Sequence, residues 1–292
     1  HRDLHSFPTR RSSDLTNTPA GNELMRKIYG ERLLLIPYVM PGFKLSRKVL
    51  EITKNVDWTQ FEGMILLNHG IFTFGNTARE SYGRMIDLVS LAENYLEKHS
   101  TLANTVAPDS VPVEMEGNAE EETVAPDSVP VKEDLLKLGR IRRKVSEIRG
   151  SAMLAQLNFS TEARTFAKLS NLKEIATRGP ITSDHLIRTK PVPAIIDPEN
   201  LEQNLDDFAA EYKAYFERHT NGQQKCLDSA PRWAVWPGIG TLAFGTNLTE
   251  SGIVADIAEH TVKAIQQAEN LQGNGTSGTW TPVSEKHLFD AE

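Results

Sequence analysis

One histidine stands in a sequence context that suits a metal ligand. His69 follows the apolar run Gly63–Leu67 and Asn68, and Gly70 comes directly after it. The run predicts a buried strand, so His69 lies in the turn at its end, where glycine allows close approach of the backbone. A neutral imidazole is a preferred ligand of Zn²⁺, and catalytic zinc sites leave one coordination position open. Taken alone, a single histidine at a strand end is more often a structural or surface residue.

Two further patterns carry polar residues without defining a reaction. Asp184, His185 and Lys190 lie close together in the sequence, and such a cluster can contact a substrate. A capped turn with a salt bridge is the more common explanation. Gly70 and Gly75 have the spacing of a phosphate-binding loop, but Asn76-Thr77 follows where that loop needs Lys and then Ser or Thr. The sequence therefore assigns no catalytic residue and no nucleotide-binding loop.

The composition limits the classes of partner. The chain has 292 residues and a formal net charge of −7, and its Lys and Arg residues form no block. Nucleic acid is therefore not an expected partner. Since no apolar run approaches the roughly 20 residues that a membrane helix needs, no membrane association is expected either. The single cysteine, Cys226, is interpreted as a structural thiol, which predicts a reducing, cytoplasmic compartment.

The first fifteen residues are expected not to be native. Residues 1–15 have no initiator Met, no helical or strand period and no apolar core of a signal peptide. This segment is similar to translated sequencing-adapter read-through, so His1 and His5 are not counted as ligands despite their spacing. From Thr16 the pattern predicts regular elements: a helix within Gly21–Gly30, a strand at Leu33–Ile36, a helix at Lys44–Lys54, strands at Gly63–Leu67 and Ile71–Phe74, and a helix ending near Lys98.

The last of these helices has a clear start signal and a broad apolar surface. Thr77 and Glu80 form a capping box, in which a hydroxyl and a carboxylate satisfy free backbone N–H groups. The helical period predicts an inward face, and further apolar residues broaden it. We therefore expect the helix to be deeply buried or to meet a second copy of the chain in a homo-oligomer. The predicted inward residues are Tyr82, Met85, Ile86, Val89 and Leu96, and the broadening ones are Leu88, Leu91 and Tyr95.

A Pro- and Glu-rich segment separates two parts of the chain. Residues 101–134 contain the sequence TVAPDSVPV twice, at Thr105–Val113 and Thr123–Val131, which indicates a duplicated, disordered linker. A second lobe is predicted over 135–292. Its expected elements are helices at Glu133–Arg149, Thr161–Leu169 (capped by Ser160), Ser183–Thr189, Pro198–His219 and Asn247–Asn270, a strand at Val192–Ile196 and a strand–turn–strand at Arg232–Gly245.

The two parts contain a partial internal repeat. When the sequence is shifted by 170 positions, glycines, a phenylalanine and the start of a capped helix align. Thr77 falls on Asn247, another good N-cap residue, and both have Glu three residues later. His69, however, falls on Ile239. We infer two lobes of similar local structure, of which only the first can bind metal through this turn.

The segment Gly63–Leu96 resembles the C-terminal third of the class II aldolase/adducin domain. The hallmark is an apolar strand, a His-Gly turn, a second short strand ending in Gly, and a helix with a late Ala-Glu. Thr16–Gly21 and Ile36–Phe43 resemble the version fused to a short-chain dehydrogenase, the bifunctional rhamnulose-1-phosphate aldolase/dehydrogenase type. Arg178–Lys190 and Pro231–Gly240 are similar to the middle region of that group.

The resemblance implies a fold and a metal site. It implies an α/β fold with a mostly antiparallel, class II aldolase-like sheet flanked by helices and a related second lobe. Residues 16–100 would be the C-terminal part of the aldolase domain, and 135–292 a second aldolase-like lobe leading to a dehydrogenase domain. By resemblance, His69 is the third His ligand of Zn²⁺, and a His-x-His pair supplies the other two. No His-x-His occurs in this chain, so the fragment is expected to be inactive.

Three functions remain open on the sequence. The parent is expected to be a zinc-dependent aldolase that cleaves a sugar phosphate, such as rhamnulose 1-phosphate, by retro-aldol chemistry. Alternatively, these lobes support a fused NAD(P)-dependent short-chain dehydrogenase. A non-enzymatic, adducin-like scaffold is the third possibility. A His-x-His ahead of Thr16 would favour the aldolase, and a glycine-rich fingerprint after Glu292 would favour the dehydrogenase.

Overall fold

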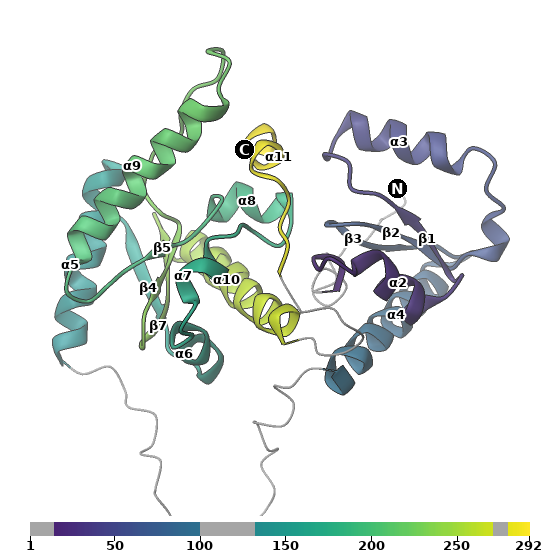
Figure 1. Ribbon diagram of the computed structural model, residues 1–292, viewed down its shortest axis with the longest axis horizontal. Helices are drawn as coiled ribbons and strands as arrows, with labels where there is room; N and C mark the ends of the chain where they lie inside the picture. Colours follow the sequence, from purple (N-terminus) through teal and green to yellow (C-terminus); the bar gives the residue numbers. More distant parts are fainter. Residues whose placement is uncertain (1–14, 100–131, 271–279) are drawn as a thin grey trace, which may run out of the picture.

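The computed structural model describes residues 15–99, 132–270 and 280–292. They form two lobes, each a small sheet with helices around it (Figure 1). This mixed α/β architecture agrees with the predicted fold class. The expected tail, apart from its last residue Leu15, and the two copies of TVAPDSVPV lie outside the described residues. Leu15 is buried in the core of the first lobe. No helix in the described parts of the chain is long and apolar enough to cross a membrane.

The first lobe contains a three-stranded sheet of order β1-β2-β3. Strand β1 pairs parallel with β2, and β2 pairs antiparallel with β3. Helices α3 and α4 lie on opposite sides of this sheet (Figure 1). The elements run α2 (Gly21–Tyr29), β1 (Leu33–Ile36), α3 (Phe43–Thr53), the short 3-10 helix η1 (Trp58–Gln60), β2 (Gly63–Leu66), β3 (Gly70–Thr73) and α4 (Ala78–His99).

Helix α4 buries a different stripe from the one that the sequence predicted. Two of the predicted inward residues, Tyr82 and Ile86, are 61% and 48% exposed. The buried stripe recurs every three or four residues, at Met85, Leu88, Ala92 and Leu96. It packs with residues of α2, β2 and β3 in one core. Met85 and Leu96 are buried as predicted, so the predicted face was off by roughly a sixth of a turn, because the helix has more apolar residues than the small sheet can cover.

The second lobe contains a four-stranded sheet of order β4-β7-β6-β5. The β4–β7 and β7–β6 pairs are antiparallel, whereas β5 pairs parallel with β6. The elements run α5 (Lys132–Arg149), β4 (Leu154–Asn158), α6 (Thr161–Ala167), α7 (Leu172–Ala176), α8 (Ser183–Thr189), β5 (Ala194–Ile195), α9 (Leu201–His219), β6 (Trp233–Trp236), β7 (Gly240–Gly245), α10 (Leu248–Glu269) and α11 (Glu285–Ala291).

Both faces of the second sheet are covered. Successive side chains of a strand point to opposite faces. On β6, Trp233 and Val235 pack into the core with α6, α7 and α10, while Ala234 and Trp236 pack into the core with α5 and α9. Both tryptophans are at most 4% exposed, so the pair belongs to the core. The second lobe is thus a three-layer structure.

The internal repeat is visible in the backbone pairing. Gly63 pairs with Thr73 and Leu66 with Gly70 in the first lobe. At a shift of 170, Trp233 pairs with Ala243 and Trp236 with Gly240 in the second. The parallel partner strand, β1 or β5, lies on the same side of each hairpin. The similar local structure that the sequence predicted is therefore confirmed.

Candidate functional site

The His69 turn closes the β2–β3 hairpin at the junction of the two lobes. The backbone N–H of His69 donates to Leu66 O at 3.0 Å. Two residues beside it have positive φ angles: Asn68 at 57° and Gly70 at 148°. Asn tolerates the left-handed region better than most residues, and glycine adopts it without a Cβ clash. The turn therefore holds His69 in one backbone position.

Asn17 links this turn to the second lobe. Its side chain is almost fully buried, at 1% exposure. The Asn17 Oδ1 atom accepts from Asn68 Nδ2 at 3.0 Å, and Asn17 Nδ2 donates to Ile181 O at 2.7 Å. The backbone N–H of Thr281 also donates to Asn17 O at 2.8 Å. Because one buried side chain bonds both sides, the position of the turn depends on the second lobe.

The imidazole of His69 is mostly buried and faces a carboxylate. Its side chain is 17% exposed, and Nε2 lies 3.7 Å from Oδ2 of Asp184, which is 58% exposed. The ring stacks loosely on Phe72, with centroids 6.3 Å apart. The Nδ1 atom is buried and has no hydrogen-bond partner among the described residues. The structure thus brings together one predicted ligand and one acidic residue from a segment that was predicted only as a polar cluster.

Two hydroxyl groups lie beside Asp184. Burial raises the pKa of Tyr38 above its ordinary value, the nearby Ser183 hydroxyl lowers it, and the charge of Asp184 raises it further. Although these groups are close, neither the Tyr38 nor the Ser183 hydroxyl makes a hydrogen bond of good geometry within the described part of the chain. Buried hydroxyl groups are normally paired. The Tyr38 and Ser183 hydroxyls are therefore buried polar groups that the described residues around them do not satisfy.

These groups fit part of a metal site. An imidazole nitrogen and a carboxylate oxygen are both zinc ligands, and catalytic zinc sites use three protein ligands. Within residues 15–99, 132–270 and 280–292, no group of three or more His, Cys, Asp or Glu side chains is placed to hold a metal. The described residues therefore supply two donors, His69 and Asp184. The assignment of His69 as a ligand stays a prediction.

The cluster predicted at Asp184, His185 and Lys190 does not form. Asp184 points to His69, whereas His185 Nδ1 and Thr182 Oγ1 lie 2.6 Å apart, within hydrogen-bonding distance. The Lys190 ammonium lies over the ring of Tyr212, 3.2 Å from its centroid. Asp184 and His185 point in different directions from α8, and Lys190 follows the helix with a positive φ of 63°, so neighbours in sequence are separated in space. The expected capped turn is also wrong, since Thr182 makes no side-chain cap.

The buried groups of that segment have shifted pKa values. Burial and the neighbouring His260 lower the pKa of His185 to about 4. Burial, with the charge of Arg232, lowers the pKa of Lys190 to about 8, against the opposing effect of Asp228 and other acidic groups. Burial raises the pKa of Cys226, which suits the structural thiol that the sequence predicted. His185 is therefore neutral and Lys190 mostly charged near neutral pH.

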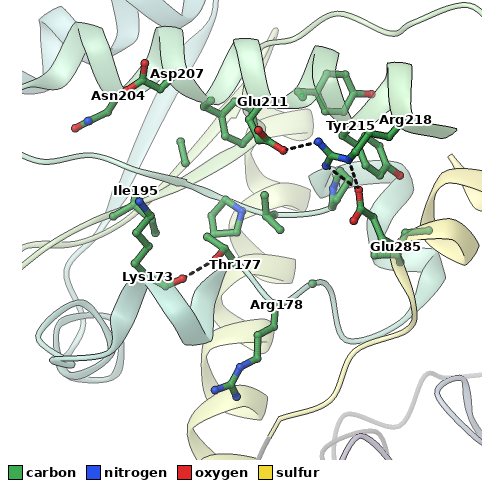
Figure 2. A pocket seen from close by; sticks show the side chains of 18 of the residues that line it. Lys173, Thr177, Arg178, Ile195, Asn204, Asp207, Glu211, Tyr215, Arg218 and Glu285 are labelled. Atoms are coloured by element: carbon green, nitrogen blue, oxygen red, sulfur yellow. Dashed lines mark hydrogen bonds and ion pairs between the residues drawn. The ribbon is translucent and has the colours of Figure 1, made fainter. Parts of the chain in front are cut away.

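A separate pocket of about 650 Å³ lies in the second lobe, between α9 and the segment that leads into β5 (Figure 2). Its volume is in the range of small-molecule sites. Two arginines at its rim are already paired with carboxylates. Arg218 contacts Glu211 at 2.9 Å and Glu285 at 2.8 Å. Arg178 is similarly engaged by Glu174 and Glu269. These two arginines are therefore neutralised by carboxylates of the same lobe.

Sequence reasoning missed the residues that position His69. Asn17 and Ile181 O are 164 residues apart, and Asn17 and Asn68 are 51 apart. No local period or spacing connects such positions. Asn17 lies in the segment Thr16–Gly21, which carried part of the family resemblance, and this was the only signal that pointed to it. Tyr38 and Ser183 lie in two other segments that carried the resemblance.

Comparison with known proteins identifies both lobes. The family model described as "Class II Aldolase and Adducin N-terminal domain" matches residues 12–96. The model described as "Aldolase class II, second domain" matches residues 133–292. A Bacillus subtilis (strain 168) protein named "Uncharacterized oxidoreductase YuxG" is 26% identical over 315 aligned residues, which cover 99% of this chain and 42% of that protein. The chain thus spans less than half the length of this relative. No solved structure matches the chain.

The two family matches together cover most of the chain and coincide with the two lobes. The first contains the His69 hairpin, and the second contains the hairpin that has Ile239 at the same position. Asn17 and Asp184, which bring the lobes together at the turn, each lie within one of the matches. From its sequence and its two-lobed structure, the chain belongs to the class II aldolase/adducin family.

Proposed function

We propose that residues 16–292 are the aldolase part of an enzyme that cleaves a sugar phosphate by a retro-aldol reaction, with His69 as one of its metal ligands. The supporting observation is the His69 turn. A mostly buried imidazole is held at the end of a strand, and its Nε2 faces a carboxylate across the lobe junction. Family membership supports a sugar phosphate of the rhamnulose 1-phosphate type as the substrate.

The chain's own residues position and surround the site. A divalent cation bound there would act as a Lewis acid on the carbonyl oxygen of a ketose phosphate. Asn17 holds the turn that carries His69 through its bond to Asn68. The buried hydroxyl groups of Tyr38 and Ser183 lie beside Asp184 without a hydrogen bond of good geometry among the described residues. We further propose that this chain by itself has no measurable aldolase activity, because its described residues supply only two donors, His69 and Asp184.

A second candidate function follows from the Bacillus subtilis relative. That protein is named an oxidoreductase, and this chain covers 42% of its length. These lobes would then support an oxidoreductase domain elsewhere in a longer polypeptide. The two functions are compatible in one bifunctional protein, and they differ in whether the His69 site binds a cation and a sugar phosphate.

The proposal is tested by measuring whether the substrate increases the amount of zinc that the chain retains. The chain is incubated with zinc, desalted, and assayed for zinc in the presence and absence of rhamnulose 1-phosphate. We expect substoichiometric zinc, which the sugar phosphate increases, because a ligand that binds the metal-loaded state stabilises it. The variant His69→Ala should lose this increase, and the control His99→Ala should keep it.

Two results would contradict the metal-binding proposal, and a third would contradict the proposed lack of activity. Stoichiometric zinc that survives in His69→Ala would show that the metal binds elsewhere. Zinc retention that does not respond to the sugar phosphate would favour the supporting role in an oxidoreductase. Release of a triose phosphate by the chain alone would contradict the predicted lack of activity.

A further inference from the structure

The Nε2 atom of His69 and the Oδ2 atom of Asp184 are too far apart for a direct hydrogen bond. The two atoms are 3.7 Å apart, whereas the donor and acceptor of an N–H···O hydrogen bond are usually no more than about 3.2 Å apart. Two ligands that each lie about 2.0–2.2 Å from a tetrahedral ion are roughly 3.4 Å from one another. Asp184 is 58% exposed, so a small rotation of its side chain closes the difference. The spacing therefore suits a shared cation better than a direct bond.

We propose that Asp184 is a second protein ligand of the divalent cation at His69, so that the cation is held between the two lobes. The inference rests on the proposed function, because it requires His69 to bind the cation. It extends that function by giving the second lobe a direct part in the site. The lobe then completes the metal site as well as supporting the fold.

The structure fixes the backbone segments that carry the two ligands relative to one another. The residue before His69, Asn68, donates to Asn17 at 3.0 Å. Asn17 in turn donates to the carbonyl of Ile181, close before Asp184 in the chain, at 2.7 Å. A single buried side chain therefore connects the backbone segments that carry both ligands. Preorganised ligands of this kind need little reordering when an ion binds.

The surroundings of Asp184 supply further oxygen atoms. Ser183 is 1% exposed, yet its hydroxyl has no partner of good geometry among the described residues, and the same holds for the Tyr38 hydroxyl. The Tyr38 hydroxyl lies near the hydroxyl of Ser183 and near the charge of Asp184. Groups around a metal ligand commonly bond to it or to metal-bound water. The two buried hydroxyls are placed to bond to the Asp184 carboxylate when it turns towards the cation.

The related turn in the second lobe provides an internal comparison. Ile239 occupies the position of His69, and its N–H donates to Trp236 O at 3.0 Å, as that of His69 does to Leu66 O. The side chain of Ile239 packs against the core of α5 and α9. The hairpin thus forms without a ligand at this position. The imidazole and its facing carboxylate are a feature of the first turn only.

Cobalt titration of the full chain tests the assignment. Co²⁺ is added to the wild type and to His69→Ala, Asp184→Asn and the control Asp256→Asn, which changes an exposed aspartate on α10. Affinity comes from calorimetry, and ligand geometry from the visible absorption of Co²⁺. We expect Asp184→Asn to weaken binding by about tenfold or more, since loss of even an outer partner commonly has that effect. Its absorption spectrum should also change.

The controls separate the two proposals. Asp256→Asn should bind like the wild type, and thermal unfolding of Asp184→Asn without metal should match the wild type because Asp184 is exposed. If Asp184→Asn binds Co²⁺ as tightly as the wild type and His69→Ala does not, this inference is wrong and the proposed function stands. If His69→Ala also binds like the wild type, both are wrong.

Discussion

At the scale of single residues, the position of His69 depends on Asn17, a residue to which we assign no ligand or catalytic role. Asn17 uses its carbonyl oxygen for Asn68 and its amide for Ile181 O. Each bond crosses between segments that are far apart in sequence. Removing a buried partner leaves the other group desolvated and unpaired, which usually has a larger effect than the net value of the hydrogen bond.

The substitution Asn17→Ala is therefore expected to reduce the free energy of unfolding by about 2–4 kcal/mol, because it leaves Ile181 O and Asn68 Nδ2 unpaired in the lobe junction. Urea denaturation measures the change. The control is Asn204→Ala, which removes an exposed bond to the backbone N–H of Asp197 and should change the free energy by less than about 1 kcal/mol. Equal effects of the two substitutions would contradict the structural role of Asn17.

His185 gives a pH dependence with a defined direction. Its pKa is lowered from 6.5 to about 4 by burial and by His260. The unfolded chain therefore takes up a proton near pH 6.5 while the folded chain does not. Stability is complete above pH 6.5 and falls as the pH decreases towards 4, by up to about 3 kcal/mol for this group.

Urea denaturation at pH 7.5, 5.5 and 4.5 measures that fall. In the variant His185→Gln, which has no titrating group at this position, the stability should change less steeply over the same range. Parallel pH profiles for the two proteins would show that His185 titrates normally in the folded state.

At the scale of elements, the two hairpins and the helices that follow them share one topology but differ in their packing. In both, the first-turn Glu of the helix accepts from a backbone N–H just before the cap, at 2.8 Å. The glycine that ends the second strand differs in its surroundings. A Cβ on Gly245 would lie 2.3 Å from the backbone N of Ser251, whereas a Cβ on Gly75 would lie 3.0 Å from the flexible side chain of Glu80.

Alanine at these matched positions should therefore have unequal effects. Gly245→Ala is expected to lower the unfolding free energy by about 2–4 kcal/mol, because the backbone of α10 must move. Gly75→Ala should lower it less, by about 1 kcal/mol, since a shift of a few tenths of an ångström relieves its contacts with the side chain of Glu80. Thermal or urea unfolding of the two variants compares them directly, and a larger loss for Gly75→Ala would refute the packing difference.

Local signals predicted the elements that position the site. The apolar run, the His-Gly turn and the Thr77 cap lie within a short stretch, and the hairpin and helix formed as expected. Strand β4 was not predicted because its side chains are only partly buried and give a weak alternating pattern. The face of α4 was misassigned because apolar residues surround much of that helix. Long-range contacts such as Asn17 with Ile181 have no local signal at all.

At the scale of the whole molecule, α4 has apolar side chains that the rest of the described structure does not cover. Tyr82 and Ile86 lie one turn apart and are 61% and 48% exposed. Residues spaced in this way share one face of a helix. The homo-oligomer expected from the sequence would bury this face against a second copy of the chain.

Replacing both residues by Lys should therefore shift the sedimentation coefficient towards the monomer without lowering the unfolding temperature, because neither side chain belongs to the core. The matched control is Leu50→Lys on α3, a residue that is 69% exposed on another helix. It should leave association unchanged. Identical sedimentation of the double variant and the wild type would exclude this helix from the interface.

The most direct test of the metal-binding role of His69 is the imidazole ¹⁵N NMR spectrum during zinc titration. The chain has eight histidines, and each gives its own pair of ring nitrogen signals. The first signal to shift should be Nε2 of His69, which faces Asp184, and the shift should be absent in His69→Ala. A first shift at any other histidine, with His69 unchanged, would contradict the assignment of this turn as the metal-binding element.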